Sequence, residues 1–256
     1  MIRKPIKLGL IGAGKWGKNY IKTISEVRDV ILHRIASSNP NIETFIPTNT
    51  IVSKNWDDLI NENDIDGLII SVPPAIQPII ATAALKKKIP LLLEKPLSLN
   101  PRSADEILTM AMDNDVLVMV NHIFLYNPGF IKLKEEVMVD SPIKSIRSVS
   151  GNMGPFRDEW SSLWDWGPHD LSMCLSLIEE KVNITNVFHK TDKSINQGRN
   201  YFVNLQFESG VEAELYFGNG FSKKKKIFSV LTETSEYVFN DLAQDKLTVK
   251  KNKGDK

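Results

Sequence analysis

The chain has 256 residues, of which 42% are hydrophobic and 25% are charged, and its formal net charge at pH 7 is +1. These values are typical of a soluble globular protein with one large domain or two of ordinary size. A charge so close to zero gives no reason to expect nucleic acid or a membrane surface as a partner. The single cysteine, Cys174, excludes an internal disulfide framework and fits a reducing compartment. We therefore expect a cytoplasmic protein without a membrane span, a signal peptide or a metal site.

A glycine-rich turn follows the first predicted strand. The apolar run Ile6-Lys7-Leu8-Gly9-Leu10-Ile11 leads into Gly12-Ala13-Gly14-Lys15-Trp16-Gly17, which matches G-x-G-x-x-G, and a helical pattern follows. Gly12 permits a tight turn, Gly14 lets a pyrophosphate approach the backbone, and Gly17 lets the helix pack closely on the strand. The free N–H groups and the dipole of the helix N-terminus favour phosphate. This context predicts a dinucleotide-binding site.

The second predicted strand, residues 30–36, ends at Ser37-Ser38. A fold selective for NAD usually places an acid here to hold the ribose 2′-OH, and an Arg nearby accommodates the 2′-phosphate of NADP. This chain has neither, and both serines can hydrogen-bond either group. The serines are also ordinary turn formers before Pro40, so the choice between NAD and NADP stays open, and we predict weak discrimination.

Strand and helix patterns then alternate as far as Asn121. Strands are expected at 51–52, 67–71, 89–93 and 116–120, with helices at 56–60 and 77–88 and a third after Asn100-Pro101. This alternation predicts a doubly wound parallel sheet, the Rossmann arrangement, over residues 1–121. The strand Leu91-Leu92-Leu93 stops at Glu94-Lys95-Pro96, at the sheet edge where ligands usually bind. By itself this charged pair would indicate only a solvated ion pair.

The pattern changes after Asn121. A helix is expected at 130–139, followed by strands at 146–150, 184–188, 201–207, 211–217, 227–231, 236–239 and 247–249, with a hairpin at 208–210. Residues 122–256 are therefore predicted to form a second α/β domain with an open, mainly antiparallel sheet. We expect the lysine run 223–226 to be a solvated loop and Cys174 to be a packed core thiol.

Asp165 and His169 lie four residues apart around Gly167-Pro168. Pro168 suits the first turn of a helix, so His169 would sit in that turn, where the helix dipole disfavours an imidazolium ion. A neutral histidine can accept a proton, and Asp165 could orient it or balance its charge. Each residue also has an ordinary interpretation, His169 as a surface or capping residue and Asp165 as a helix cap.

The glycine turn, the Glu94-Lys95-Pro96 turn and the run Asp165-Trp166-Gly167-Pro168-His169-Asp170 together resemble the glucose–fructose oxidoreductase / inositol dehydrogenase (Gfo/Idh/MocA) family over essentially the whole chain. The resemblance implies a Rossmann domain followed by an open-sheet domain. It also implies NAD(P)-dependent hydride transfer on sugars, cyclitols or nucleotide-linked sugars. By this resemblance Lys95 anchors the reacting hydroxyl, His169 is the general acid/base and Asp165 is its companion.

The expected site has a cofactor part and a substrate part. The residues expected to contact the cofactor, NAD or NADP, are Gly12, Gly14, Lys15, Trp16, Gly17, Ser37, Ser38, Ser71, Pro73, Gln77, Glu94 and Lys95. The rim of the substrate pocket is expected to be aromatic and basic, and is assigned to Tyr126, Arg157, Trp160 and Trp164. The chain departs from the family at Gln77, where many relatives have His, and at Tyr126, where Arg is common. It is also shorter than typical members and ends in the polar stretch 250–256.

The leading hypothesis is therefore an NAD(P)-dependent oxidoreductase that acts on a secondary hydroxyl or ketone of a carbohydrate. We expect Lys95, Asp165 and His169 to meet in a cleft between the domains. One alternative is an enzyme that retains its cofactor and cleaves glycosides, and another is a non-enzymatic dinucleotide sensor. Because an exposed apolar sheet face is costly, we also expect a homodimer or homotetramer formed through the C-terminal sheet.

Overall fold

The computed structural model describes residues 4–193 and 197–252, so the last part of the polar C-terminal stretch, residues 253–256, lies outside the described residues. The chain divides into two compact units, residues 1–121 and 122–256. Within the described residues, none of the helices has the length and apolar composition needed to cross a membrane.

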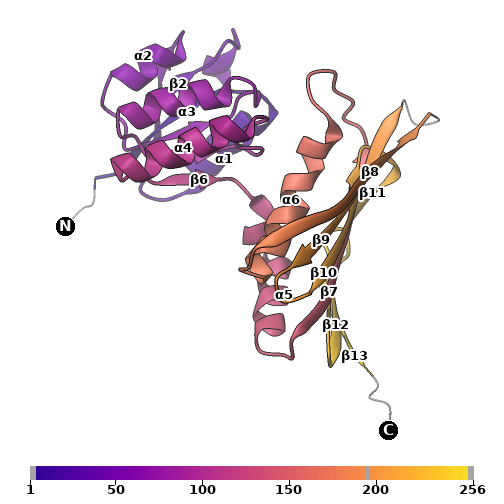
Figure 1. Cartoon of the computed structure of the whole chain (residues 1–256). Coiled ribbons are helices and arrows are strands. Elements are labelled where there is room, and N and C mark those ends of the chain that lie inside the picture. Colours follow the sequence, from indigo (N-terminus) through magenta and orange to yellow (C-terminus); the bar gives the residue numbers. More distant parts are fainter. Residues whose placement is uncertain (1–3, 194–196, 253–256) are drawn as a thin grey trace. The chain divides into compact units, whose positions relative to one another are not determined.

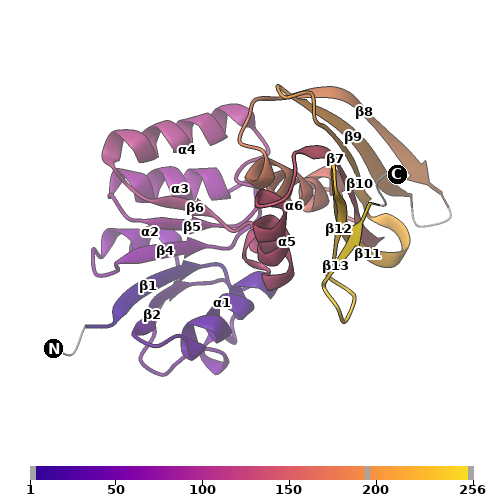
Figure 2. The same cartoon turned by 90° about the horizontal axis from the view of Figure 1, so that it is seen from below.

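The first unit is a six-stranded parallel sheet with helices on both faces (Figure 2). The strands lie in the order β3-β2-β1-β4-β5-β6 and comprise β1 (Ile6–Ile11), β2 (Val30–Ala36), β3 (Ile51–Ser53), β4 (Gly67–Ile70), β5 (Leu91–Leu93) and β6 (Val118–Val120). The helices are α1 (Lys15–Glu26), α2 (Trp56–Asn61), α3 (Gln77–Lys86) and α4 (Pro101–Asn114), with a 3-10 turn η1 (Ile42–Thr44). The strand order reverses between β1 and β4, which is the topological switch point where such sheets bind ligands. The predicted doubly wound fold is confirmed.

Apolar side chains on both faces explain why this sheet forms. On one face, Ile21 and Ile24 of α1 pack with Leu10 and Leu32 of the sheet. On the other, residues of α2, α3 and α4 cover the opposite side of β1, β4 and β5. Strands buried on both faces read as continuous apolar runs, which is the pattern that β4 and β5 show. Asn100 caps α4, because its side chain accepts a hydrogen bond from the Arg102 N–H at 2.9 Å.

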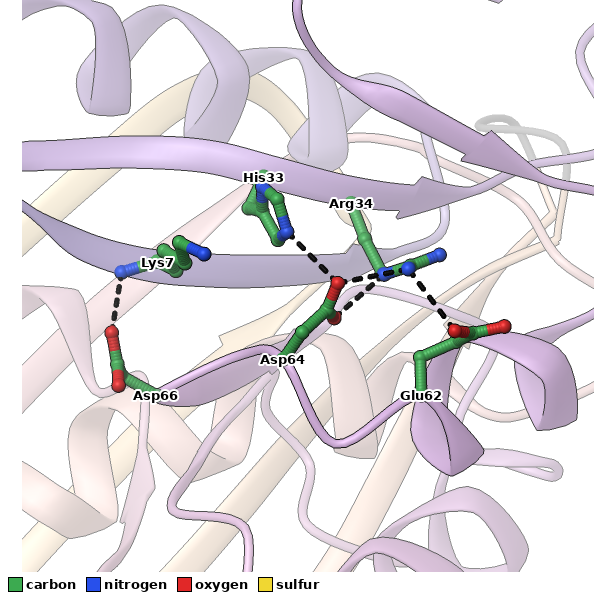
Figure 3. Close-up of polar contacts among 6 residues, drawn as sticks. All are labelled: Lys7, His33, Arg34, Glu62, Asp64 and Asp66. Atoms are coloured by element: carbon green, nitrogen blue, oxygen red, sulfur yellow. Dashed lines mark hydrogen bonds and ion pairs between the residues drawn. The ribbon is translucent and has the colours of Figure 1, made fainter.

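A charged cluster fixes the loop between α2 and β4 (Figure 3). Arg34 of β2 donates from Nε to Asp64 Oδ1 at 2.6 Å and from Nη2 to Asp64 Oδ2 at 2.8 Å, and it also reaches Glu62 at 3.3 Å. His33 Nε2 lies 3.0 Å from Asp64 Oδ2. The hydrogen bonds from Arg34 are the main reason that the pKa of Asp64 is lowered to about 2. The cluster therefore joins β2 to the chain that enters β4.

The second unit is a seven-stranded, mainly antiparallel sheet with helices on one face (Figure 1). Its order is β13-β12-β11-β7-β10-β9-β8, in which the β7–β10 pair is parallel and the other neighbouring pairs are antiparallel. The strands are β7 (Ile143–Met153), β8 (Val182–Asp192), β9 (Gly198–Phe207), β10 (Glu212–Gly218), β11 (Gly220–Thr232), β12 (Ser235–Asn240) and β13 (Leu247–Lys251). The helices are α5 (Pro128–Met138) and α6 (Ser162–Leu177), preceded by a 3-10 turn η2 (Ile123–Tyr126). The predicted open-sheet architecture is confirmed.

The two faces of this second sheet differ in what covers them. Alternate residues such as Leu215 and Phe228 form one core with α5 and α6, and that core includes the fully buried Cys174, as predicted. Burial is the main cause that raises the pKa of this thiol. The opposite face carries a row of stacked rings, with Phe188 and Phe202 4.5 Å apart and Phe202 and Tyr216 4.2 Å apart between centroids. In Figures 1 and 2, α5 and α6 both lie on the other side of the sheet, so neither of these two helices of the unit covers this face.

The sequence predicts that the lysine run 223–226 is a solvated loop, and this prediction is wrong. The run lies inside β11, which pairs with β7 across a register shift between Gly220 and Lys225. The first three lysines are exposed, whereas Lys226 points to the helix side of the sheet and is buried. A lysine is rarely buried unless it is paired, and Lys226 pairs with Asp170 of α6. The partner on a distant helix explains why the local sequence was misleading.

The start of α6 also differs from the prediction. The helix begins at Ser162, because the Ser161 hydroxyl oxygen accepts a hydrogen bond from the Leu163 N–H at 3.0 Å and caps it. Asp165 therefore lies in the first turn, and Pro168 lies inside the helix. His169 is two turns from the helix N-terminus, so the proposed dipole effect on its imidazole does not apply, since that effect fades within the first turn.

Candidate functional site

The glycine turn between β1 and α1 has the geometry of a dinucleotide cradle. Gly12 has φ +94°, and a Cβ there would overlap the Ser71 carbonyl oxygen, while a Cβ on Gly17 would overlap the Gly12 carbonyl oxygen. Gly14 has an ordinary φ of −69°, and a Cβ added there would meet nothing within 4 Å. The fold itself therefore requires glycine at 12 and 17 but not at 14. The open space beside Gly14 fits the close approach of a ligand to the backbone.

The first turn of α1 is open to such a ligand. Gly14 is the N-cap residue and provides no side-chain cap, so no side chain of the cap satisfies the first N–H groups of α1. Lys15 and Trp16, both predicted cofactor contacts, are exposed in this first turn. A phosphate at this position would gain the N–H groups and the dipole of the helix. The residues present fit a dinucleotide pyrophosphate.

The ends of β2 and β4 lie beside this turn in the sheet order. Ser37 Oγ accepts a hydrogen bond from the Asn39 N–H at 3.1 Å, which is the turn-forming role, and Ser38 is exposed. Ser71 donates its backbone N–H to Ile11 at 2.8 Å, and Pro73 is exposed after it. Cofactor contacts of these four residues stay predictions.

Glu94 follows β5 directly and is buried, so the solvated ion-pair interpretation does not hold for it. Its Oε1 accepts a hydrogen bond from the Tyr20 hydroxyl at 2.6 Å and another from Asn121 Nδ2 at 3.0 Å. Burial, and then Glu94 itself, raise the pKa of Tyr20, so its phenol remains a donor. Tyr20 thus connects α1 to the turn that carries Lys95.

Gln77 holds the Glu94-Lys95-Pro96 turn through hydrogen bonds to its backbone. It is buried at the start of α3, and its Nε2 donates to the carbonyl oxygens of Glu94 at 2.7 Å, Pro96 at 3.1 Å and Leu97 at 3.1 Å. These hydrogen bonds hold the backbone on both sides of Lys95. The structure gives Gln77 a positioning role, and its direct contact with a cofactor stays a prediction.

In the second unit, Asp165 and His169 lie one turn apart on the same side of α6. Asp165 accepts hydrogen bonds from Trp160 Nε1 at 3.1 Å and from Arg157 Nε at 3.2 Å. The Arg157 guanidinium also lies over the Trp160 ring at 4.9 Å. The structure thus brings together three of the predicted site residues, Arg157, Trp160 and Asp165. Trp164 adjoins Asp165 in α6, and Tyr126 is exposed at the end of η2.

His169 is buried against residues that sequence reasoning missed. The Phe124 ring of η2 meets the imidazole edge-to-face, with the centroids 5.0 Å apart and an interplanar angle of 86°. The next residue, Asp170, pairs with Lys226. One signal was available, because Lys226, Phe228 and Val230 alternate in the strand pattern and place Lys226 on the core face. The sequence pattern did not indicate that Tyr20 and Asn121 donate hydrogen bonds to Glu94.

No group of three or more His, Cys, Asp or Glu side chains that could hold a metal ion occurs in the described parts of the chain. Lys95 belongs to the first unit, whereas Asp165 and His169 belong to the second. Their joint action on one substrate stays a prediction.

Comparison with known proteins supports the same class. The family model for Gfo/Idh/MocA, described as an oxidoreductase family with an NAD-binding Rossmann fold, matches residues 6–122. A crystal structure of a candidate oxidoreductase from Magnetospirillum magnetotacticum MS-1 shares 33% identity with a TM-score of 0.87, and the match covers 98% of this chain and 83% of that one.

Two curated relatives match over shorter parts. The uncharacterized oxidoreductase YrbE of Bacillus subtilis is 25% identical over 82% of this chain and 66% of its own length. Inositol 2-dehydrogenase 1 of Paenarthrobacter aurescens is 30% identical over 40% of this chain and 31% of its own length. The chain thus spans just under two thirds of the first of these relatives and less than one third of the second.

A Rossmann unit with a dinucleotide cradle, followed by an open-sheet unit, defines a nicotinamide-dependent class of protein, and the cofactor is NAD or NADP. The chain belongs to the Gfo/Idh/MocA family of oxidoreductases.

Proposed function

We propose that this protein is a dehydrogenase or reductase that interconverts a secondary hydroxyl and a ketone on a sugar, a cyclitol or a nucleotide-linked sugar. The observation that carries the proposal is the combination of the Gly12–Gly17 cradle with Lys95, Asp165 and His169 in one chain. A sensor of dinucleotides would need the cradle but no set of proton-transfer residues. The cyclitol dehydrogenase among the relatives supports an alcohol of this class.

Each catalytic residue has a distinct role in this proposal. A bound nicotinamide dinucleotide supplies the hydride acceptor or donor. Lys95 holds the reacting oxygen of the substrate through its ammonium group. The turn that carries Lys95 is held by hydrogen bonds from Gln77. His169 takes the hydroxyl proton in the oxidative direction and returns it in the reductive direction. Asp165 orients His169 or balances its charge.

The cofactor part can be tested without a substrate. Gly14→Val adds a branched side chain where the fold leaves open space, so the variant should fold while its NAD and NADP affinities fall by orders of magnitude. Gly17→Val is the contrasting variant, because its side chain would overlap backbone and should damage the fold itself. Unchanged affinity in a folded Gly14→Val protein would contradict the proposed pyrophosphate site.

The substrate part is tested with a panel. Inositols, sugars and nucleotide-sugars are assayed by the absorbance of reduced cofactor, with NAD and NADP side by side. We expect turnover with at least one secondary alcohol, and less than about a thousandfold preference between the cofactors, roughly 4 kcal/mol. Product formation without net cofactor reduction would instead indicate the cofactor-retaining alternative. Tight dinucleotide binding without any turnover would indicate a sensor.

The substrate rim is proposed to include Tyr126, Arg157, Trp160 and Trp164. Sugar rings stack on aromatic faces, and the Arg157 guanidinium, fixed by Asp165 and Trp160, can bind a phosphate or carboxylate of the substrate. Arg157→Lys keeps the charge and should raise KM for a nucleotide-sugar more than for a neutral inositol. An equal change in KM for both would argue against a charged group on the substrate.

We further propose that the protein is cytoplasmic and forms a homodimer or homotetramer through the open face of the second sheet. Exposed apolar side chains, including Ile184, Val187 and Phe188, lie along β8. A second copy would cover the stacked row of Phe188, Phe202 and Tyr216. Sedimentation equilibrium should show a dimer or tetramer that Phe188→Lys weakens. A monomer at all micromolar concentrations would contradict this assembly.

A further inference from the structure

A buried ion pair lies directly beside His169. Lys226 Nζ of β11 is 2.6 Å from Asp170 Oδ1 of α6, and the two side chains are 4% and 0% exposed. The Ser150 hydroxyl of β7 donates to the other carboxylate oxygen of Asp170. The helix is thus fixed to two neighbouring strands at the residue that follows His169. Because successive residues on a helix point about 100° apart, this attachment also determines the direction in which His169 points.

The ammonium of Lys226 also contacts the Phe124 ring, which in turn contacts His169. It lies 4.0 Å from the centroid of the Phe124 ring, and the same ring meets the His169 imidazole at 86°. A cation over the face of an aromatic ring is attracted by the ring quadrupole, most strongly when both are desolvated. Lys226 therefore holds Phe124 in place, and Phe124 restricts the rotation of the imidazole.

Stability alone is a weak explanation for this arrangement. Two buried charges can usually be replaced by well-packed apolar residues without loss of stability. An apolar pair would fill the space but would not fix the rotation of α6 as directional hydrogen bonds do. The pair therefore has the features expected of a group that sets orientation.

We propose that Lys226, with Asp170 and Phe124, is a positioning residue that holds the His169 ring in its productive orientation. The proposal rests on the proposed role of His169 as the acid/base. Lys226 acts through Phe124 and Asp170 and takes no part in proton transfer itself.

The first test observes the imidazole directly. The protein has four histidines, so a ¹H–¹³C spectrum of the rings contains few resonances, and His169→Gln assigns the one of interest. The double variant Asp170→Leu/Lys226→Met removes both charges together and should therefore fold. We expect the His169 resonance to shift or broaden, because the ring current of Phe124 is no longer fixed, while the resonance of His33, in the other unit, stays in place. Lys224 is an exposed lysine on the same strand, so Lys224→Met is the matched control and should change neither the His169 nor the His33 resonance.

The second test separates orientation from binding. In the double variant kcat should fall by about a hundredfold, as expected for a displaced catalytic group, while the cofactor Kd stays unchanged. Phe124→Leu should reproduce part of this loss with the ion pair intact. A folded double variant with an unchanged His169 resonance and an unchanged kcat would overturn the proposal. If His169→Ala were fully active, the proposed function would fail instead, while the resonance, which needs no substrate, would still test the positioning.

Discussion

Each unit buries one carboxylate directly beside a proposed catalytic residue, and the two carboxylates are satisfied in different ways. Glu94, next to Lys95, accepts hydrogen bonds from two neutral donors, Tyr20 and Asn121. Asp170, next to His169, is paired with the ammonium of Lys226. Neutral donors stabilise a buried anion by modest increments, whereas a buried ion pair depends on both members being present. The second unit should therefore respond far more sharply to the loss of one partner.

Each buried carboxylate lies next to a residue that is proposed to take part in the reaction. Removing the neighbours themselves should have the largest effect. Lys95→Ala and His169→Ala should each lower kcat by about a hundred- to ten-thousandfold, the usual effect of deleting a general acid or base or its polarising partner. Cofactor affinity, measured by fluorescence titration, should survive in both. His189→Ala, on the exposed strand β8, is a control that should leave kcat unchanged. Normal turnover by His169→Ala would show that the residue beside Asp170 is not catalytic.

The next effect concerns the ion pair. Lys226→Met leaves Asp170 buried with the Ser150 hydroxyl as its donor among the described residues, and should lower the free energy of unfolding by about 3–5 kcal/mol. The double variant Asp170→Leu/Lys226→Met should recover most of this loss, because no charge is left without a partner. Urea denaturation of the two variants measures the difference. Equal destabilisation of the single and double variants would show that packing, and not charge, dominates at this position.

A smaller effect is expected at Glu94. Tyr20→Phe removes the 2.6 Å hydrogen bond but leaves the donor of Asn121, so the loss should be about 1.5–3 kcal/mol, typical of a hydrogen bond to a charged group. The same urea titration serves here. A loss as large as that of Lys226→Met would mean that Glu94 depends on Tyr20 as strongly as Asp170 depends on Lys226, which would contradict the expected difference between the two units.

The two units also differ in how well the sequence predicted them. In the first, the strand–glycine–helix signals are local, because a turn at Gly12 and a cap at Asn100 depend on nearby residues. In the second, the burial of Lys226 depends on Asp170, 56 residues away in the chain, and no local pattern reveals that partner. Pro168 predicts a helix start near residue 168, whereas α6 begins at Ser162, after the cap that Ser161 forms. Turns and caps that depend on neighbouring residues could be predicted from the sequence, whereas an ion pair between residues far apart in the chain could not.

The smallest effect should be the pH dependence that Asp64 gives to the stability of the first unit. Because Arg34 lowers the pKa of Asp64 from its ordinary 3.8 to about 2, the ionised carboxylate stabilises the fold fully above pH 4 or so. This contribution is lost as the pH falls from about 4 to about 2, through the folded-state pKa. The stability difference between wild type and Asp64→Asn should therefore shrink over that interval. A difference that stays constant down to the lowest pH at which both fold would contradict the ion-pair cause.

The most direct test of the proposed function is a single-turnover measurement of cofactor reduction. Protein in excess over NAD or NADP is mixed with the best alcohol from the panel, and the absorbance of reduced cofactor is followed in wild type, Lys95→Met and His169→Gln. We expect rapid reduction by the wild type, and equal cofactor binding but at least about a hundredfold slower reduction by both variants. Reduction by both variants at the wild-type rate, or no reduction by a wild type that binds the cofactor and every member of the panel, would contradict the proposed function.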